Sequence, residues 1–540
     1  MSYQLPMAFL TQLRISDFLI LGTGVWVATK IVKQLTRTRG TRLNGPPRDS
    51  WLLGVGRRLS SAVEPAEVFE EWAAEYGSVF EQPMALGGSK LVLTDPRAVN
   101  HFYASERSVY IKTQMTRNVI GNLIGHGLLY AEGEDHKRQR KALTPAFSNA
   151  AIRRLTEVFF DSAYKLKSHW DTQLEGAPDG VVMDVEAWMN RVALDSIGIA
   201  GFSHEFRSLD GEASTVADAF DAMAFNGNRA SIINLAVFLL GTQIPFLAHL
   251  PTPRNRLTRK LKKTLGTIAE GLLEKTRKDK ANQQEAMDKS VIGLLLKAEQ
   301  EDAELHMDKE EITAQMNVLL LAGYETTSIS MTWALIELCR RPDIQAKLRD
   351  ELTSFGPQDA TWDQLTSSLP YLDAVVLEIL RLHPAVPETT RQAQTDDVIP
   401  LSEPITAKSG ELVTQIAVPK DTVVTVSIRC MNRSTAFWGP DAAEFRPERW
   451  LTFDVDDLRA KAIQGHRHLI TFLDGPRQCL GKQFALAEFK AVLSVLIKNY
   501  SFELPGGPKT DITTVLGLIR RPKVVGEEGP VVPLRIRRAE

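Results

Sequence analysis

The sequence predicts a mainly α-helical protein with a small β region, and two observations support this fold class. Across residues 130–390 apolar side chains recur mostly at helical spacing, in long stretches broken by polar positions. Strand-like segments rich in β-branched residues occur near the start of the chain and again after residue 385. A third observation, an apolar segment at residues 15–32, predicts one transmembrane helix ahead of the folded part.

The elements follow in order from these patterns. Residues 66–76 read as a helix, and the strands at 79–86 and 90–94 are joined by Gly87-Gly88-Ser89, which is a hairpin signal. The remaining elements that we expect are helices at 254–280, 310–340 and 480–498 and a strand at 422–427. Residues 277–289 are charged and poor in apolar side chains, so they predict an exposed connection.

The amino-terminal segment is typical of an uncleaved membrane anchor. Basic residues follow the apolar segment, and Asp49 is the only acid between residues 30 and 58. This order favours an anchor with a cytosolic domain over a cleavable signal peptide, although a buried or interfacial helix is the alternative. The predicted organisation is a short lumenal segment (1–14), an anchor (15–32), a basic tether that ends in prolines (33–47) and one catalytic domain (48–540).

Composition excludes several functional classes. Charged residues make up 24% and hydrophobic residues 44%, which is ordinary for a globular protein, and a net charge of -2 argues against a nucleic-acid partner. The 3 cysteines are too few and too scattered for a disulfide framework, which fits a reducing compartment. Cys339 and Cys430 read as small buried hydrophobes.

Cys479 has neighbours that suit a thiolate ligand of iron. In the segment from Phe472 to Gly481, Gly475 permits a sharp turn, and Cys479 falls at the start of a helix whose N–H groups stabilise a sulfur anion. Gly481 lets this helix approach a flat ring, and Arg477 is placed to pair with a propionate carboxylate.

This segment matches F-x-x-G-x-R-x-C-x-G at every specified position, and the chain therefore resembles the cytochrome P-450 superfamily over roughly residues 45–540. The resemblance implies the fold of that family, a haem b cofactor and Cys479 as its axial ligand, whose electron donation favours O–O cleavage.

Two further motifs support the resemblance. Glu378 and Arg381 match the family's E-x-x-R helix, and the resemblance implies that they form a buried structural triad with Arg449. The segment 322–327 (AGYETT) is similar to the distal helix of the family. There Thr326 and Glu325 are expected to relay protons to reduced dioxygen, and Gly323 to leave room for it above the ring. The alternative is a helix whose threonines simply bond back to carbonyl groups.

Residues 132–140 look like the family's W-x-x-x-R helix, with His136 in the place of tryptophan. The resemblance implies that Arg140 binds a propionate, whereas His136, whose charge changes near neutrality, is either a second donor or a surface histidine. Arg391 corresponds by position to another propionate contact.

The anchor and tether resemble the microsomal, eukaryotic branch of the family. This implies an endoplasmic reticulum membrane location, and electrons from NADPH through a separate NADPH-cytochrome reductase. The predicted reaction is insertion of one atom of O2 into a lipophilic substrate such as a terpenoid, sterol, fatty acid or xenobiotic. A reductase-independent peroxide isomerase or dehydratase and a non-catalytic haem sensor are the alternatives.

Family position also predicts the segments that line the substrate pocket, which are 108–128, 226–250, 316–323, 386–389 and 515–518. They are mainly aliphatic, with Phe238 and Phe246 in the second. Residues 232–250 either dip into the membrane interface, with basic residues 254–263 on lipid phosphates, or form a core-facing helix followed by a solvated one.

Overall fold

A computed structural model describes residues 40–62, 65–211, 253–280, 291–300, 302–451 and 459–539 of the chain. Its α-helices are α2 (Gly56–Ser61), α3 (Pro65–Tyr76), α4 (Pro96–Ala104), α5 (Gln114–Ile124), α6 (Gly133–Leu143), α7 (Asn149–Gln173), α8 (Val185–Phe202), α11 (Pro253–Lys280), α12 (Val291–Ala298), α13 (Lys309–Arg340), α14 (Pro342–Ser354), α15 (Trp362–Ser367), α16 (Pro370–Leu382), α17 (Ile428–Arg433), α18 (Thr435–Trp438) and α19 (Lys482–Asn499).

Its strands are β1 (Val79–Pro83), β2 (Ser89–Leu93), β3 (Tyr110–Ile111), β4 (Val181–Asp184), β5 (Glu388–Ala393), β6 (Asp397–Thr406), β7 (Leu412–Val418), β8 (Val423–Ser427), β9 (Tyr500–Glu503), β10 (Ile512–Leu516), β11 (Arg520–Val524) and β12 (Pro533–Arg538). The predicted class, mainly helical with a small β component, is therefore correct for the described residues.

The two strand-rich regions belong to one sheet, which corrects the expectation of two separate regions. This sheet has the order β1-β2-β8-β5-β3, in which β2 pairs with β8 in parallel. β1 and β2 pair as the predicted hairpin, but a 3₁₀ turn at Ala85–Gly87 shortens the first strand. Leu86 and Gly87 both have positive φ in this turn, which an extended strand does not tolerate.

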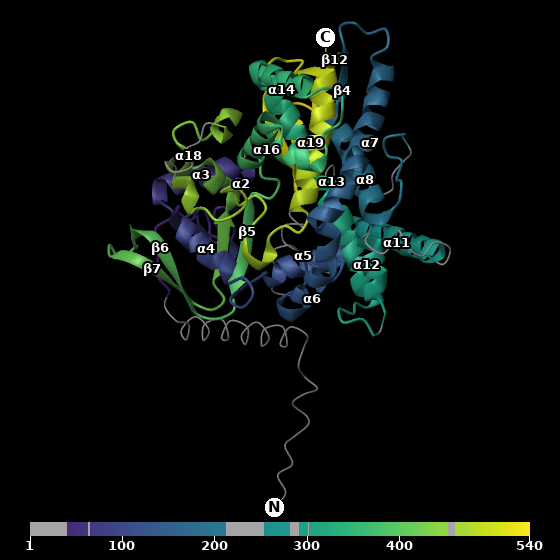
Figure 1. Cartoon of the computed structure of the whole chain (residues 1–540). Helices are drawn as coiled ribbons and strands as arrows, with labels where there is room; N and C mark the ends of the chain where they lie inside the picture. Colours follow the sequence, from purple (N-terminus) through teal and green to yellow (C-terminus); the bar gives the residue numbers. More distant parts are fainter. Residues whose placement is uncertain are drawn as a thin grey trace, which may run out of the picture.

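The five-stranded sheet and most of the long helices lie on different sides of the molecule. In Figure 1, β5, β6, β7 and α4 lie to the left, whereas α7, α8, α11 and α12 lie to the right and α13 runs between the two groups. The long helices begin and end close to the predicted boundaries, but the expected exposed connection at 277–289 is helical up to Lys280. The end of α11 carries charged side chains on its solvent face, and for this reason its sequence resembles that of an exposed loop.

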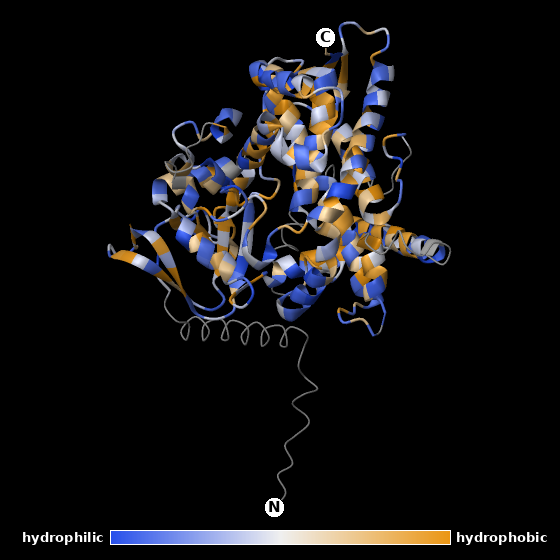
Figure 2. Ribbon diagram, in the orientation of Figure 1, coloured by the Kyte–Doolittle hydropathy of each residue, from blue (hydrophilic) through white to orange (hydrophobic). Residues whose placement is uncertain are grey.

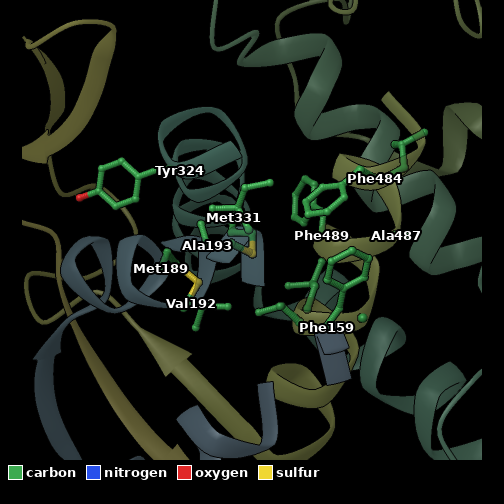
Figure 3. Packing of buried hydrophobic residues seen from close by; sticks show 14 of the residues in the cluster. Phe159, Met189, Val192, Ala193, Tyr324, Met331, Phe484, Ala487 and Phe489 are labelled. Carbon is green, nitrogen blue, oxygen red and sulfur yellow. The ribbon is translucent and has the colours of Figure 1, made fainter. Parts of the chain in front are cut away.

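The helical core is built from large apolar side chains of four helices. Figure 3 shows Phe159 of α7, Met189 of α8, Met331 of α13 and Phe484 of α19 among the packed residues. The rings of Phe159 and Phe484 meet edge to face with centroids 4.8 Å apart. In Figure 2 the polar helix α6 at the periphery is mostly blue, as expected for a helix with one solvated face.

The predicted membrane anchor at 15–32 lies outside the described residues. Among the helices that are described, none is both long and apolar enough to cross a bilayer.

Glu378, Arg381 and Arg449 meet as expected in the core beneath α16. Both carboxylate oxygens of Glu378 accept from the Arg381 guanidinium at 2.8 Å, and one of them accepts from Arg449 Nε at 2.9 Å. The three side chains are at most 2% exposed. Arg381 also donates to the carbonyl oxygens of Asn432 and Ala442, so α16 is tied to the chain that precedes the cysteine segment.

Replacing Glu378 by glutamine is expected to destabilise the protein by about 3–5 kcal/mol, because it leaves the buried Arg381 guanidinium without its anion and Arg449 with Asp441 alone. Urea unfolding of the full chain followed by circular dichroism measures this change. The matched control is Glu304→Gln, which removes an exposed partner of Lys141 and should cost less than about 1 kcal/mol. Equal losses in the two variants would contradict a structural role for the triad.

Candidate functional site

The cysteine segment is a tight loop that leads into α19. The Cys479 backbone N–H donates to the Phe472 carbonyl oxygen at 2.8 Å, so the loop closes on itself. Gly475 has a φ of +64°, and a Cβ at this position would lie 2.5 Å from the carbonyl oxygen of Tyr103. The predicted need for glycine at 475 is correct, and the contact with the end of α4 is an additional reason for it.

Cys479 precedes Gly481, the residue that caps the amino-terminal end of α19. The Gly481 N–H bonds to the Cys479 sulfur and lowers the pKa of the thiol, as do the nearby charges of Arg140 and Lys482. Burial is the largest influence and raises that pKa. The side chain is nevertheless accessible, unlike the buried Cys339 and Cys430, so the sulfur lies in a recess of the fold. A bound metal ion is the usual source of the charge that deprotonates such a thiol.

The predicted α6 residues lie next to this loop. His136 and Arg140 are one helical turn apart, and His136 is 8% exposed, so it is not the surface histidine of the alternative reading. Burial, followed by the charges of Arg477 and Lys112, lowers the pKa of His136 to about 3. This corrects the expectation that its charge changes near neutrality, because the imidazole is neutral throughout that range.

Lys112 and two carboxylates, Glu132 and Glu106, also lie near Arg477, although no sequence motif singles them out. Lys112, just after β3, forms an ion pair with Glu132 at 3.1 Å, and burial lowers its pKa to about 7. Arg477 also pairs with Glu132 and donates to the Ala131 carbonyl oxygen at 3.2 Å. Sequence reasoning missed Lys112 and Glu132 because charged residues in loops are usually solvated, and only the fold brings these together.

Arg391, on β5, pairs with a second carboxylate that the sequence did not identify. Its Nη2 lies 2.8 Å from Glu106 Oε1, and the two side chains are 9% and 0% exposed. We use the name cationic cluster for His136 and the six charged residues around it, which are Lys112, Arg140, Arg391, Arg477, Glu106 and Glu132.

The distal motif lies on α13, and one of its residues has an additional role in packing. Thr326 is partly exposed, and its hydroxyl donates to the Ala322 carbonyl oxygen at 2.7 Å. A Cβ on Gly323 would meet the Ile197 side chain at 2.7 Å. Glycine is therefore also favoured at this position because α13 packs closely against α8, and the role of Gly323 in leaving room for dioxygen stays a prediction.

The side chain of Glu325 is buried, whereas that of Thr326 is partly exposed. It is 1% exposed, and its Oε1 lies 2.7 Å from Nη2 of the fully buried Arg521 on β11. Arg521 Nη1 also lies 3.4 Å from Glu186 at the start of α8. A proton relay that uses Glu325 must therefore work against an ion pair, which the motif alone did not reveal.

Comparisons with known proteins agree with this geometry. Residues 44–525 match the model of the family described as cytochrome P-450. The chain belongs to the cytochrome P-450 family. It is 55% identical to cytochrome P-450 monooxygenase claQ of Ampulloclitocybe clavipes, over 97% of this chain and 98% of that protein. It is 48% identical to claW of the same fungus, over 99% of both chains, and 35% identical to cytochrome P-450 monooxygenase 205 of Postia placenta, over 96% of both. The chain is thus a cytochrome P-450 monooxygenase.

The charge of the cluster fits the haem of this cytochrome P-450. Its described residues include four cations and two carboxylates, and His136 is neutral. This excess of positive charge suits two propionate carboxylates, which would also oppose the burial and the repulsion from Arg477 that lower the Lys112 pKa. An iron porphyrin with two propionates requires a ligand for the iron and cations for the carboxylates, and the thiol and the excess of cations meet these two requirements.

Glu488 is a further buried carboxyl near the distal helix of this cytochrome P-450. It lies on α19, is 0% exposed, and lies near Ser196 of α8 and Thr327 of α13. Burial raises its pKa to about 8, so the group is largely protonated at neutral pH. No sequence pattern distinguishes this glutamate from the other residues of α19, so it could not be identified before the structure.

The expected substrate-lining segments are only partly described. Residues 226–250, with Phe238 and Phe246, lie outside the described residues, and they include the whole segment 232–250 that was expected either to dip into the membrane or to face the core. Val119, Val386 and Leu516 come from three of the other segments and are exposed apolar side chains. A small apolar pocket elsewhere is lined by Phe147, Leu155, Ile197, Leu319 and Phe484, among others, and only Leu319 belongs to an expected segment.

The raised pKa of Glu488 predicts a pH dependence of stability. Its pKa rises from 4.5 in the unfolded chain to about 8, so the folded protein binds the extra proton, and this stability is present below pH 4.5 and lost as pH rises towards 8. Glu488→Gln should therefore have a higher thermal midpoint than wild type at pH 8 and lose this advantage near pH 5. Circular dichroism melts test this, with Glu310→Gln as an exposed control. An advantage that does not change with pH would contradict the assignment.

Proposed function

We propose that this chain is a haem-thiolate monooxygenase that inserts one oxygen atom of O2 into a lipophilic substrate, with electrons from NADPH-cytochrome reductase. The observation that carries the proposal is the accessible Cys479 thiol at the start of α19, next to a cluster with two excess positive charges. When bound, haem b supplies activation of dioxygen, which the thiolate favours by electron donation.

The chain holds the cofactor from two sides in this proposal. Cys479 would ligate the iron through its sulfur, and the closed loop with Phe472, Gly475 and Gly481 fixes the position of that sulfur. His136, Arg140, Arg391 and Arg477 would hold the propionate carboxylates. A neutral His136 donates one N–H at any pH between 5 and 8, so its contribution does not vary over that range.

Protons are delivered from α13. The Thr326 hydroxyl donates to the Ala322 carbonyl oxygen in this structure, and it would turn its hydrogen towards the oxygen-binding side to pass on a proton. Glu325 would restore that proton through ordered water after its carboxylate separates from Arg521 and takes up a proton from solvent, while Glu186 continues to neutralise Arg521. Glu378, Arg381 and Arg449 are structural and take no part in proton transfer.

A lipophilic substrate suits the aliphatic character of the expected pocket lining. The names of the relatives specify no substrate. The substrate classes are a terpenoid, sterol, fatty acid or xenobiotic. Product profiling of membranes that contain this chain and a reductase, with and without NADPH, tests the reaction. Turnover of a hydroperoxide without NADPH or O2 would instead support the isomerase, and no product from any class would support the sensor.

We further propose that residues 15–32 anchor the chain in the endoplasmic reticulum membrane. The folded part supports this with an exposed apolar patch near the tether, formed by Trp51, Leu52 and Met84, which are 66%, 54% and 37% exposed. Trp51 and Leu52 accept backbone hydrogen bonds from the turn at Ala85–Gly87, so the patch is held together. Such a patch is typical of a membrane contact.

The full chain is expected to float with liposomes and to resist carbonate extraction, because the anchor crosses the bilayer. A chain that begins at residue 40 should be released by carbonate while keeping weak binding through the patch. Trp51→Ser in this shorter chain should reduce that weak binding. Carbonate release of the full chain would contradict the anchor.

Cys479→Ser should abolish the thiolate-type absorption of the ferrous carbon monoxide complex, because an alcohol does not provide the anionic sulfur ligand. Cys430→Ser is the matched control, because Cys430 is a buried thiol on α17 outside the cysteine loop, and its loss should leave the band unchanged. If the band survives in the Cys479 variant, the proposed function is wrong.

Thr326→Ala should lower the ratio of product formed to NADPH consumed by about 10-fold and release more peroxide, because the last proton donor is lost. Thr327→Val is the control, since Thr327 is buried against Glu488 on another face of α13. Coupling that is equal to wild type in Thr326→Ala would remove this residue from the mechanism.

A further inference from the structure

We propose that Glu106 is an internal counter-ion of the cationic cluster, which fixes Arg391 and lowers the reduction potential of the haem iron by limiting the excess positive charge beside it. This inference rests on the proposed haem site and names a residue that neither the family motifs nor the predicted site contained.

Glu106 lies where three parts of the site meet. It follows α4, in the short connection to β3, and its N–H donates to the Tyr103 carbonyl oxygen at 3.3 Å. The same carbonyl oxygen is the atom that Gly475 of the cysteine loop approaches. The side chain of Glu106 is 0% exposed, so it acts on the cluster without screening by solvent.

Arg391 is held at two of its nitrogen atoms. Nη2 lies 2.8 Å from Glu106 Oε1, and Nη1 donates to the Thr390 carbonyl oxygen at 3.0 Å. The third group, Nε–H, is buried and has no hydrogen-bond partner within the described part of the chain. A guanidinium carries five N–H donors, so one fixed in this way still has donors for a carboxylate of the cofactor, among them the unpartnered Nε–H.

Burial and the neighbouring cations have opposite effects on the charge of Glu106. Burial raises its pKa, and the cations Arg391, Arg477 and Lys112 lower it again. The other titratable groups that face this region are Tyr103 on α4 and Asp474 in the cysteine loop. The surrounding cations favour the ionised form of this carboxylate, and burial, which is the larger influence, leaves its pKa raised.

Charge near a redox centre changes the energy of the added electron. Reduction of iron adds one negative charge, so nearby cations favour the reduced form and nearby anions oppose it. Without Glu106 the described cluster would have an excess of three positive charges instead of two. The negative charge of Glu106 therefore makes the iron harder to reduce, whereas the positive charge of Lys112 makes it easier to reduce.

The test measures the midpoint potential of the haem-loaded full chain by spectroelectrochemistry. Glu106→Gln should raise the ferrous to ferric ratio at a fixed applied potential on the order of tenfold, the size expected of one buried unit charge at an effective dielectric of about 20. Lys112→Met should shift that ratio in the opposite direction. Glu106→Asp keeps the charge and should stay within about twofold of wild type.

A double variant separates a counter-ion from a purely structural contact. Glu106→Gln combined with Lys112→Met restores the excess charge of two, so its potential should return to that of wild type. The proposal is overturned if Glu106→Gln leaves the potential unchanged, if the double variant shifts as far as Glu106→Gln, or if Lys112→Met shifts in the same direction. Should Glu106→Gln fail to load haem, the double and lysine variants still give this decision.

The thiolate spectrum of wild type, recorded first, reports on the proposed function separately. Its absence would overturn both proposals, whereas its presence with an unresponsive potential would overturn only the role of Glu106.

Discussion

The site depends on the electrostatic balance around one buried sulfur. Burial raises the pKa of Cys479, and the fold opposes this with the Gly481 N–H and the charges of Arg140 and Lys482. The same region then concentrates cations on α6, β5 and the cysteine loop. Each would be costly to bury alone, and the two glutamates reduce that cost without removing the net positive charge. A dianionic metal cofactor satisfies both requirements together.

Residues with strong local constraints could be predicted from the sequence. Gly475 needs a positive φ, and Glu378 and Arg381 lie one turn apart on one helix, so short patterns reveal both. Partners from distant segments could not be predicted. Arg521 and Glu325 are far apart in the sequence, and Glu106 meets Arg391 only because β3 pairs with β5. The five-stranded sheet was missed for the same reason, since strand pattern does not specify which strands pair.

Gly323 illustrates a limit of motif transfer. The motif correctly located a glycine on α13, but the atoms that exclude a side chain there belong to Ile197 on α8. A residue can thus be required by helix packing while it stands beside residues with chemical roles. Glu488 is the opposite case, because it has no pattern to mark it and yet has a strongly altered pKa between three helices.

The parallel pairing of β2 with β8 has a consequence for how the chain is made. Lys90 pairs with Val423, so more than 300 residues must leave the ribosome before the inner edge of the first hairpin finds its neighbour. Until then that edge exposes unsatisfied amide and carbonyl groups beside apolar side chains, which is a template for aggregation. Nascent chains of this protein therefore have a long period in which chaperone binding protects the hairpin, and synthesis stalled before residue 423 leaves it exposed.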